Sequence, residues 1–382
     1  MRFLTAGESH GPGLTIVVDG VPAGLALDPA TIDADLRRRQ LGYGRGARQK
    51  IERDSARITG GVRQGRTTGA PIAMWIDNRD AVNWERVMSV TEVPEPPDAV
   101  TRLRPGHADL AGALKYAHED VRDVIERSSA RETAARVAAG GIAKALLRQV
   151  GTDILSETEA IGDVVGTLTF DREAIEASEV RSSDRTAAAR MVEAISAARD
   201  AGDTLGGVAV VRASGVVPGL GSYVQWDRRL DGRIAQALCS IQAAKGVMFA
   251  DAFDAAHERG SRVHDPIAVR DSRFVRERNR AGGLEGGVTN GEDVVVRVAF
   301  KPISTLMKPL PSADLRTGEP SPAHVERSDV CVIPAAGVVA EAMLALVLAD
   351  ALTEKFGGDV VADLVAAIER YRERLRPIDQ RR

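Results

Sequence analysis

The sequence predicts an α/β protein of the α+β type, in which two related sheet-and-helix halves form a β-α-β sandwich within a single large domain. Short β-branched runs bounded by glycine alternate with longer helical segments. The runs lead into Gly-x-Thr-x-Gly connections, which favour hairpins and antiparallel sheets with helices packed on them over a doubly wound sheet. Several motifs also recur once in the same order, which indicates halves of about 1–200 and 201–382 within the domain 1–382.

Four segments have the composition of strands, and five have the length and pattern of helices. The predicted strands are Leu14–Val18, Ile72–Ile76, Val208–Val211 and Val294–Phe300. The predicted helices are Pro29–Arg39, Thr133–Gln149, Ala187–Ala201, Arg228–Ala244 and Val338–Phe356. The last helix has Lys355 in its final turn and two glycines directly after it, which is a common helix ending.

Three pairs of segments carry the internal similarity. Each pair joins a segment of the first half to one of the second, and the order along the chain is the same. The pairs are 18–25 with 213–220, 60–69 with 282–291, and 125–128 with 325–328. A duplicated fold would bring two equivalent helix starts together, which is one way to build a site between halves.

The strongest functional signal lies just before the second predicted helix. Ser129 and Glu132 have the spacing of a capping box, so Ser129 is expected to be the N-cap. A helix start with free N–H groups, hydroxyls and the flanking Arg127 and Arg131 can bind an anion. A plain capped helix would show the same spacing, but these arginines and the nearby His107 favour a site.

Other segments have a composition that packing alone does not require. His10 lies in a glycine turn, where backbone can approach a ligand closely. The glycine-spaced arginines of 37–48 are either a solvated charge run or a loop that closes over an anion. Lys301–Thr305 offers an ammonium and two hydroxyls after a strand, and Ser240–Gly246 reads as the end of a buried helix.

The composition excludes several classes of protein. A net charge of −3 and 4% aromatic residues argue against nucleic-acid binding. Cys239 and Cys331 are too few and too far apart for a disulfide framework or a metal cluster. No apolar stretch follows Met1, and no run is long and apolar enough for a membrane span, so a cytoplasmic protein is expected.

Familiar catalytic motifs are also missing from the sequence. It has no phosphate-binding G-x-x-x-x-G-K-[ST] loop, no dinucleotide-binding order of strand, glycines and helix, no H-E-x-x-H and no G-x-S-x-G. These absences leave a histidine and arginine site for a small anion, with phosphate the expected ligand and proton transfer the available chemistry.

Eight motifs together resemble the chorismate synthase family, and they span essentially the whole chain in unbroken order. They are GESHG at 7–11, RRRQLGYGRGAR at 37–48, RPGHAD at 104–109, ERSSARETAARVAAG at 126–140, DTLGG at 203–207, NRAGGLEGG at 279–287, KPIST at 301–305 and RSDVC at 327–331. Any one of these motifs would be weak, but eight in order are specific.

The resemblance implies a lyase of the shikimate pathway. Its reaction is the anti-1,4-elimination of phosphate and a ring proton from 5-enolpyruvylshikimate 3-phosphate, which gives chorismate for aromatic amino acid biosynthesis. The family uses reduced FMN (FMNH2) without net redox change, and NADPH enters only indirectly, for flavin reduction. The resemblance also implies a cytoplasmic homotetramer supplied by an external flavin reductase, with no nucleic acid, membrane or metal partner.

The resemblance also assigns residues. It implies that His10 is the acid beside the leaving phosphate, that His107 manages flavin protonation and that Asp329 acts at flavin N5. It assigns the substrate to Ser9, Arg39, Arg45, Arg48 and Arg131. It assigns the flavin to Arg127, Ser128, Ser129, Gln242, Ala243, Gly287, Lys301, Pro302, Ile303, Ser304, Thr305 and Arg327.

Two other functions remain open from the sequence. One is a flavin- or nicotinamide-dependent oxidoreductase on the same scaffold, which would consume NADPH by itself. The other is a non-enzymatic RNA- or anion-binding protein that uses the arginine loop at 37–48. Strongly salt-dependent RNA binding without flavin binding would favour the second.

Overall fold

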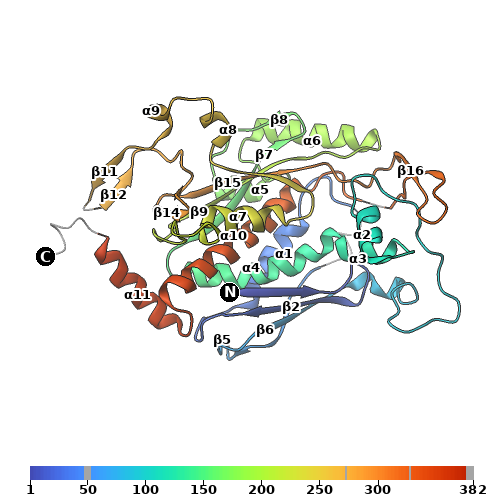
Figure 1. Cartoon of the computed structure of the whole chain (residues 1–382), viewed down its shortest axis with the longest axis horizontal. Helices are drawn as coiled ribbons and strands as arrows, with labels where there is room; N and C mark the ends of the chain where they lie inside the picture. Colours follow the sequence, from blue (N-terminus) through green and yellow to red (C-terminus); the bar gives the residue numbers. More distant parts are fainter. Residues whose placement is uncertain (47–52, 272, 327, 376–382) are drawn as a thin grey trace.

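Two antiparallel sheets enclose a layer of helices in the computed structural model, which describes residues 1–46, 53–271, 273–326 and 328–375 (Figure 1). The first sheet has the order β1 (Arg2–Ala6), β2 (Gly13–Asp19), β6 (Ile72–Asp77) and β3 (Arg57–Gly60). The second has the order β10 (Ala244–Phe249), β15 (Val294–Phe300), β9 (Gly207–Ser214), β7 (Asp153–Ile161) and β8 (Val164–Val165). The helices between them are α1 (Pro29–Gln40), α4 (Thr133–Arg148), α7 (Leu230–Cys239) and α10 (Ile333–Phe356). The predicted β-α-β sandwich is confirmed.

The remaining elements flank the sandwich or connect its strands. They are β4 (Val62–Arg63), β5 (Arg66–Thr67), η2 (Arg79–Asn83), α2 (Asp109–Tyr116), α3 (Arg122–Ser128), η3 (Ala130–Glu132), α5 (Arg172–Ala177), α6 (Arg185–Asp200), η4 (Trp226–Arg228), α8 (Ala252–Ala255), α9 (Gly260–Val263), β11 (Ile267–Arg270), β12 (Arg273–Arg276), β13 (Leu284–Glu285), β14 (Val288–Thr289), β16 (Pro311–Ala313), β17 (Pro320–Pro322) and α11 (Val361–Arg374).

Helices α4 and α10 form the centre of the core because small residues let them approach closely. A Cβ atom added at Gly140 of α4 would lie 2.3 Å from Cβ of Ala342 in α10, so only glycine fits there. Helix α10 is apolar around most of its circumference, which is typical of a helix buried on every side. One hydrophobic core, formed by residues of both sheets and these helices, therefore unites the described chain.

Helix α10 corrects one sequence-based prediction. By length and composition this helix could cross a membrane, contrary to the prediction that no run is long and apolar enough. However, 89% of its most apolar window is buried inside the protein. Its apolar surface is explained by the core of the sandwich.

The two sheets connect their strands in the same way. In chain order, four strands of the first sheet are β1, β2, β3 and β6, and four strands of the second are β7, β9, β10 and β15. In each sheet the last two strands of these sets exchange places in space, which gives β1-β2-β6-β3 and β7-β9-β15-β10. The glycine-rich hairpins also match in detail. Oγ1 of Thr67 accepts from the N–H of Leu25 at 2.9 Å, and Oγ1 of Thr289 accepts from the N–H of Leu220 at 2.8 Å. Each hydroxyl also donates to a backbone carbonyl, at 2.5 and 2.7 Å. These contacts support two related halves.

The predicted elements are confirmed with three differences. Strands β7 and β8 precede residue 200 but join the second sheet, so the sheets do not divide at that residue. The helix predicted at Arg228–Ala244 is shorter, because the chain turns at Ala243, where φ is +66°, and enters β10. Helix α10 begins at Ile333, five residues before the predicted start, with a proline in its first turn.

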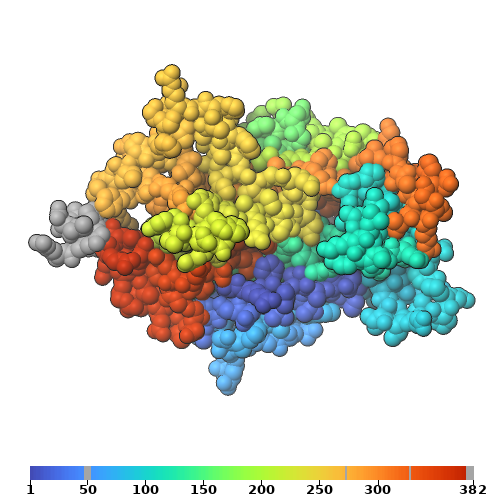
Figure 2. All heavy atoms as spheres, in the orientation of Figure 1, coloured from blue at the N-terminus to red at the C-terminus, as the bar shows by residue number. Residues whose placement is uncertain are grey.

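Two segments far apart in sequence meet at one end of the sandwich. The teal segment before α3 and the orange segment after β15 lie against each other there (Figure 2). The N–H of Leu315 donates to the carbonyl of Thr101 at 2.8 Å, and the hydroxyl of Ser312 donates to the carbonyl of Leu103 at 2.7 Å. This contact brings the RPGHAD and KPIST motifs to the same end of the molecule.

Candidate active site

The loop between β1 and β2 is held in a fixed shape by buried contacts. The side-chain amide of Asn78 donates to three loop carbonyls, at 2.7 to 3.3 Å, which belong to Glu8, Ser9 and Gly11. Gly7 has φ of +106°, and a Cβ atom there would lie 2.3 Å from the carbonyl oxygen of Gly13, so the loop requires glycine. The backbone therefore gives the side chain of His10 a defined position.

The imidazole of His10 is held on two sides. Nδ1 lies 2.9 and 3.0 Å from the two carboxylate oxygens of Glu126, and the backbone N–H of His10 donates to the same carboxylate at 2.8 Å. The ring stacks on Trp84 with 3.9 Å between centroids. Since Nδ1 faces the carboxylate, Nε2 is on the opposite edge of the ring and is the nitrogen suited to a ligand.

His107 has a similar carboxylate partner. Its Nδ1 lies 2.5 Å from Oδ1 of Asp109, whose side chain is fully buried. Arg104 contacts the same carboxylate through Nε at 2.9 Å and Nη2 at 3.0 Å. Burial opposes ionisation of Asp109, but the hydrogen bonds from His107 and Arg104 prevail and lower the pKa of this carboxyl well below its ordinary value.

The turn that carries His107 contacts the segment after β15. Nη1 of Arg104 donates to Oγ1 of Thr305 at 3.1 Å, and the ammonium of Lys301 donates to the carbonyl of Gly106. Burial, followed by the charge of Lys245, lowers the pKa of Lys301. The structure thus brings two predicted flavin positions to the predicted catalytic histidine.

Three of the predicted substrate-binding arginines converge on two carboxylates. Arg131 lies 2.7 Å from both oxygens of Asp54, and Arg39 lies 3.5 Å from one of them. Arg45 lies 2.8 Å from Asp329. Burial lowers the pKa of Arg39 to about 9; Asp54 opposes this shift, and the charges of Arg131 and Arg45 add to it. Three guanidiniums and two carboxylates leave an excess of positive charge, which suits an anionic ligand.

One buried amide connects this arginine group to the loop of His10. Nε of Arg131 donates to Oδ1 of Asn78 at 2.8 Å, and the amide nitrogen of Asn78 holds the loop carbonyls. Ser129 donates to the hydroxyl of Ser9 at 3.1 Å, which fixes the same loop from the start of η3. The predicted acid and the predicted anion-binding residues therefore share one framework.

The predicted flavin positions include buried polar atoms that lack a protein partner among the described residues. Oγ of Ser128 and Oε1 of Gln242 are both buried without a hydrogen bond. The carbonyl of Ala243 accepts from the N–H of Lys301 at 3.0 Å, so the Gln242 turn adjoins the KPIST segment. The carbonyl of Ile303 accepts from the hydroxyl of Thr204 at 2.7 Å. These hydrogen-bonding groups and the Lys301 ammonium fit a polar, anionic cofactor.

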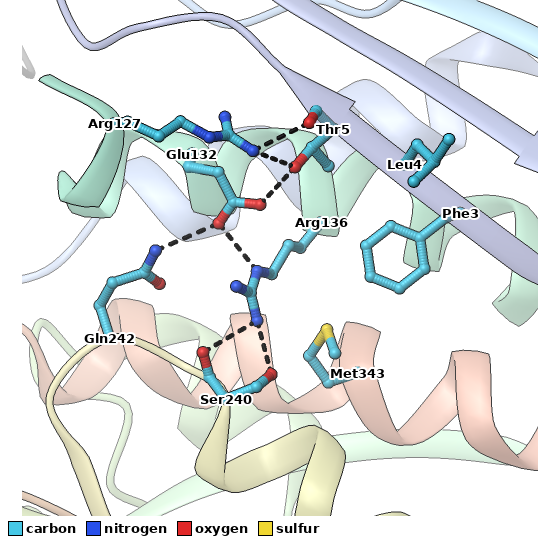
Figure 3. A pocket seen from close by; sticks show the side chains of 9 residues that line it. All are labelled: Phe3, Leu4, Thr5, Arg127, Glu132, Arg136, Ser240, Gln242 and Met343. Carbon is cyan, nitrogen blue, oxygen red and sulfur yellow. Dashed lines mark hydrogen bonds and ion pairs between the residues drawn. The ribbon is translucent and has the colours of Figure 1, made fainter. Parts of the chain in front are cut away.

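A cavity of about 410 Å³ opens beside these positions (Figure 3). It is lined by Phe3, Leu4, Thr5, Arg127, Glu132, Arg136, Ser240, Gln242 and Met343. Arg127 donates to the carbonyl of Thr5 at 2.8 Å, and Gln242 donates to Glu132 at 3.2 Å. Neither His10 nor any other predicted catalytic residue lines this cavity, so the arrangement of proton-transfer groups lies outside it.

The capping prediction is only half correct. Ser129 does cap a helical turn, but its hydroxyl accepts from the N–H of Arg131 at 3.3 Å at the start of η3 rather than of α4. The Glu132 carboxylate is not part of a capping box, because it accepts from Thr5 at 2.8 Å and from Arg136 at 2.8 Å. These longer-range contacts use the carboxylate that a local cap would need.

Other predicted positions are placed apart or lie outside the described residues. The carbonyl of Gly287 accepts from the N–H of Leu230 at 2.9 Å, at the opposite end of α7 from Gln242. Gly287 lies apart from the Gln242 turn, since α7 alone separates its two ends by roughly 15 Å. Arg48 and Arg327 lie outside the described residues. Pro302 and Ser304 share the KPIST segment, and a Cβ atom at Gly106 would lie 3.6 Å from Cβ of Ser304.

Sequence reasoning missed the residues that hold the predicted ones. They are Asp54, Asn78, Trp84, Arg104, Asp109, Arg122, Glu126 and Glu326. Signals were available for four of them, because Arg104 and Asp109 lie within RPGHAD, Glu126 opens ERSSAR and Glu326 lies in the repeated segment 325–328. Asp54, Asn78, Trp84 and Arg122 come from segments without a motif, and only the fold brings them to the site.

Comparisons with known proteins agree along the whole chain. A family model described as "Chorismate synthase" matches residues 1–353. A relative with that name from Geobacter sulfurreducens is 53% identical over 390 residues, covering 98% of this chain and 99% of the relative. Another from Thermus thermophilus is 52% identical over 381 residues, covering 98% and 100%. A solved structure described as "Crystal Structure of Chorismate Synthase" has a TM-score of 0.80 at 41% identity, covering 98% of both chains.

Proposed function

The chain belongs to the chorismate synthase family, and we propose that His10, His107 and Asp329 handle the protons of its reaction. The protein is a lyase that eliminates phosphate from 5-enolpyruvylshikimate 3-phosphate to give chorismate. The elimination moves one proton from the substrate ring and places negative charge on the departing phosphate. It therefore needs an acid, a proton acceptor and cations.

His10 is proposed as the acid beside the leaving phosphate. Glu126 holds Nδ1 and Trp84 holds the ring face, so Nε2 is the nitrogen that would protonate a phosphate oxygen. Histidine is the side chain that most readily gives and regains a proton near neutral pH. The observation that carries this role is the carboxylate–imidazole contact next to an excess of guanidinium charge.

The arginine group is proposed to bind the phosphate and the two carboxylates of the substrate. Arg39, Arg45 and Arg131 would do so together with Arg48 and the hydroxyl of Ser9. Their support is the surplus of positive charge around Asp54 and Asp329. Planar guanidiniums bind phosphate and carboxylate groups with two parallel hydrogen bonds.

Reduced FMN is proposed as the cofactor, held by Arg127, Ser128, Ser129, Gln242, Ala243, Gly287, Lys301–Thr305 and Arg327. When bound, it supplies electron density that helps phosphate leave. The unpartnered Ser128 hydroxyl and Gln242 carbonyl offer hydrogen bonds to it, and Lys301 offers a positive charge. His107, oriented by Asp109, would hold or move a proton at the cofactor, and Asp329 is proposed to act at the flavin N5 position.

The cellular setting is part of the same proposal. We infer a cytoplasmic homotetramer that receives reduced flavin from a separate, NADPH-consuming flavin reductase. Conversion of 5-enolpyruvylshikimate 3-phosphate requires no nucleic acid or membrane partner. Purified protein that consumed NADPH without a second enzyme would contradict the need for that reductase.

The deciding experiment is anaerobic turnover of 5-enolpyruvylshikimate 3-phosphate with chemically reduced FMN, following chorismate and phosphate together. Equal release of both products, absent with oxidised FMN, is the expected result. Tight binding of reduced FMN without either product would contradict the proposed chemistry. Product formation without flavin would contradict the cofactor alone.

A further inference from the structure

Two glutamates at equivalent positions of the repeated sequence meet at a single arginine. Glu126 belongs to the IERS segment of the first half, and Glu326 to the VERS segment of the second. Nη1 of Arg122 lies 3.2 Å from Oε1 of Glu126 and 2.8 Å from Oε1 of Glu326. Glu126 is 4 residues and Glu326 is 204 residues from Arg122 along the chain, so the contact depends on the fold of both halves.

The two glutamates have different second partners. Glu126 accepts from His10, and its side chain is only 1% exposed. Glu326 lies 3.2 Å from Nε2 of His324 and 3.6 Å from Arg104, and its side chain is 25% exposed. The equivalent carboxylates therefore have separate tasks: one holds the proposed acid, and the other holds the arginine between them.

Arg122 contacts both groups that hold the His10 ring. Its guanidinium carbon lies 5.3 Å from the centre of the Trp84 ring, which also stacks on the imidazole of His10. Its Nη1 reaches the carboxylate that accepts from Nδ1. A shift of this guanidinium would thus disturb the ring face and the Nδ1 contact of His10 together.

We propose that Arg122, anchored by Glu326 of the second half, is a positioning residue that fixes Glu126 against Nδ1 of His10. The inference rests on the proposed role of His10 as the acid. It goes further by assigning the orientation of that acid to a residue of the other half, which does not touch the imidazole. The proton-donating edge of His10 is selected because the opposite edge is committed to Glu126.

Electrostatics support the arrangement. Burial opposes ionisation of Glu326, but hydrogen bonding with His324 and the charge of Arg122 prevail and lower the pKa of this carboxyl to about 2. Burial likewise opposes ionisation of Glu126, and hydrogen bonding with His10 prevails to lower its pKa. Both carboxylates are therefore charged near neutral pH. Without Glu326, Glu126 would be the one described carboxylate left in contact with Arg122, and Arg122 would compete with His10 for it.

The test uses Glu326→Gln and Arg122→Gln in the full-length enzyme with reduced FMN. Glu326→Gln should lower kcat on the order of tenfold and Arg122→Gln at least as much, since residues that orient a functional ligand typically contribute 10- to 100-fold. KM and reduced-flavin affinity should stay within twofold of the unmodified enzyme, because neither residue is placed against substrate or flavin. Arg122→Lys, which keeps the charge, should recover part of kcat.

The matched control is Glu159→Gln. Glu159 pairs with Arg297 at 2.9 Å and is 19% exposed, but this pair lies on the second sheet rather than in the site. This variant should keep kcat within twofold. If Arg122→Gln does not fold, Glu326→Gln carries the test, because its side chain is partly exposed and does not contact His10.

A spectroscopic readout separates orientation from general damage. In protein with ¹⁵N-labelled histidine, long-range ¹H–¹⁵N spectra report which ring nitrogen carries the proton, and His10→Ala identifies the His10 signals. Neutral His10 should carry its proton on Nδ1 in the unmodified enzyme and the control, and should show mixed tautomers in Glu326→Gln. An unchanged tautomer with control-like kcat in Glu326→Gln would overturn the inference. Full activity of His10→Ala would instead overturn the proposed function.

Discussion

Two of the buried ion networks among the described residues differ in position, one at the centre of the sandwich and one at the end that carries the site. At the centre, Glu341 of α10 is fully buried and lies 2.7 Å from Lys144 and 2.8 Å from Arg38. At the end, Arg122 and Arg104 join the carboxylates that hold His10 and His107. The first network ties helices together, whereas the second orients the two histidines that we propose to exchange protons.

The networks differ in charge balance among the described residues. The central one pairs three cations with three carboxylates, namely Arg38, Lys144 and Arg181 with Asp35, Glu176 and Glu341. The end network has two arginines and three carboxylates, namely Arg104 and Arg122 with Asp109, Glu126 and Glu326. The balanced central network suits a structural role, whereas the end network has more carboxylates than arginines and holds two histidines against them.

The largest expected effect is on catalysis at the end network. His10→Ala and His107→Ala should each lower kcat roughly 100- to 10,000-fold, the usual scale for a group that transfers a proton. Both side chains are partly exposed, so the free energy of unfolding should change little. Steady-state kinetics under anaerobic conditions measure the first effect, and urea unfolding measures the second. Full activity of His107→Ala with bound reduced flavin would contradict its role.

The central network should give the opposite result. Glu341→Ala removes the carboxylate shared by Lys144 and Arg38 and should lower the free energy of unfolding by about 3–5 kcal/mol, because buried cations lose their partner. Activity per folded molecule should stay near that of the unmodified enzyme. Chemical denaturation measures the stability, and flavin-titrated active-site concentration corrects the rate. A large fall in kcat of Glu341→Ala with unchanged stability would contradict a purely structural role for the central network.

Neighbouring arginines sharpen the comparison. Arg38 bonds to Glu341 at the centre, while Arg39 lies beside Asp54 in the site. Arg39→Lys should raise the KM for substrate about 10- to 100-fold, since charged hydrogen bonds contribute about 1.5–3 kcal/mol. Arg38→Lys should instead lower stability with KM nearly unchanged. The same KM in both variants would show that Arg39 does not bind substrate.

The smallest expected effect is on stability in acid. The pKa of Glu326 is lowered from its ordinary value of 4.5 to about 2, so its ion pairs contribute stability above the ordinary value that is lost as pH falls toward about 2. Glu326→Gln should therefore lose less unfolding free energy over this range than the unmodified protein. Urea unfolding at successive pH values measures the difference. Parallel curves for the two proteins would contradict the lowered pKa.

The sequence predicts the layers of the fold better than its supporting contacts. Strand Val294–Phe300 appears in the structure with its predicted bounds, because a run of β-branched residues is a local signal. The early end of α7 was not predicted, since Ala243 adopts a left-handed conformation that an alanine rarely signals. The similarity of the two halves was visible in the sequence as repeated motifs. The matching hydrogen bonds of Thr67 and Thr289 could be recognised only in the structure.

The site follows the same rule. His10 and His107 stand in motifs, so both were predicted from the sequence. Trp84 and Arg122 carry no local pattern of their own, and their importance arises from contacts with residues distant in sequence. The repeat marks Glu326, but it does not reveal that Arg122 is its partner. For Glu132 a local pattern was misleading. Its spacing from Ser129 predicted a capping box, but in the structure its carboxylate accepts a hydrogen bond from Thr5 of β1.

The 204-residue separation between Arg122 and Glu326 has a consequence for synthesis of the chain. A ribosome that adds about 5–20 residues each second takes roughly 10–40 seconds to travel from the first position to the second. During that time the nascent polypeptide carries His10, Glu126 and Arg122, but the anchor from the second half has not been made. The arrangement that orients His10 can therefore form only after the second half of the chain has been synthesised.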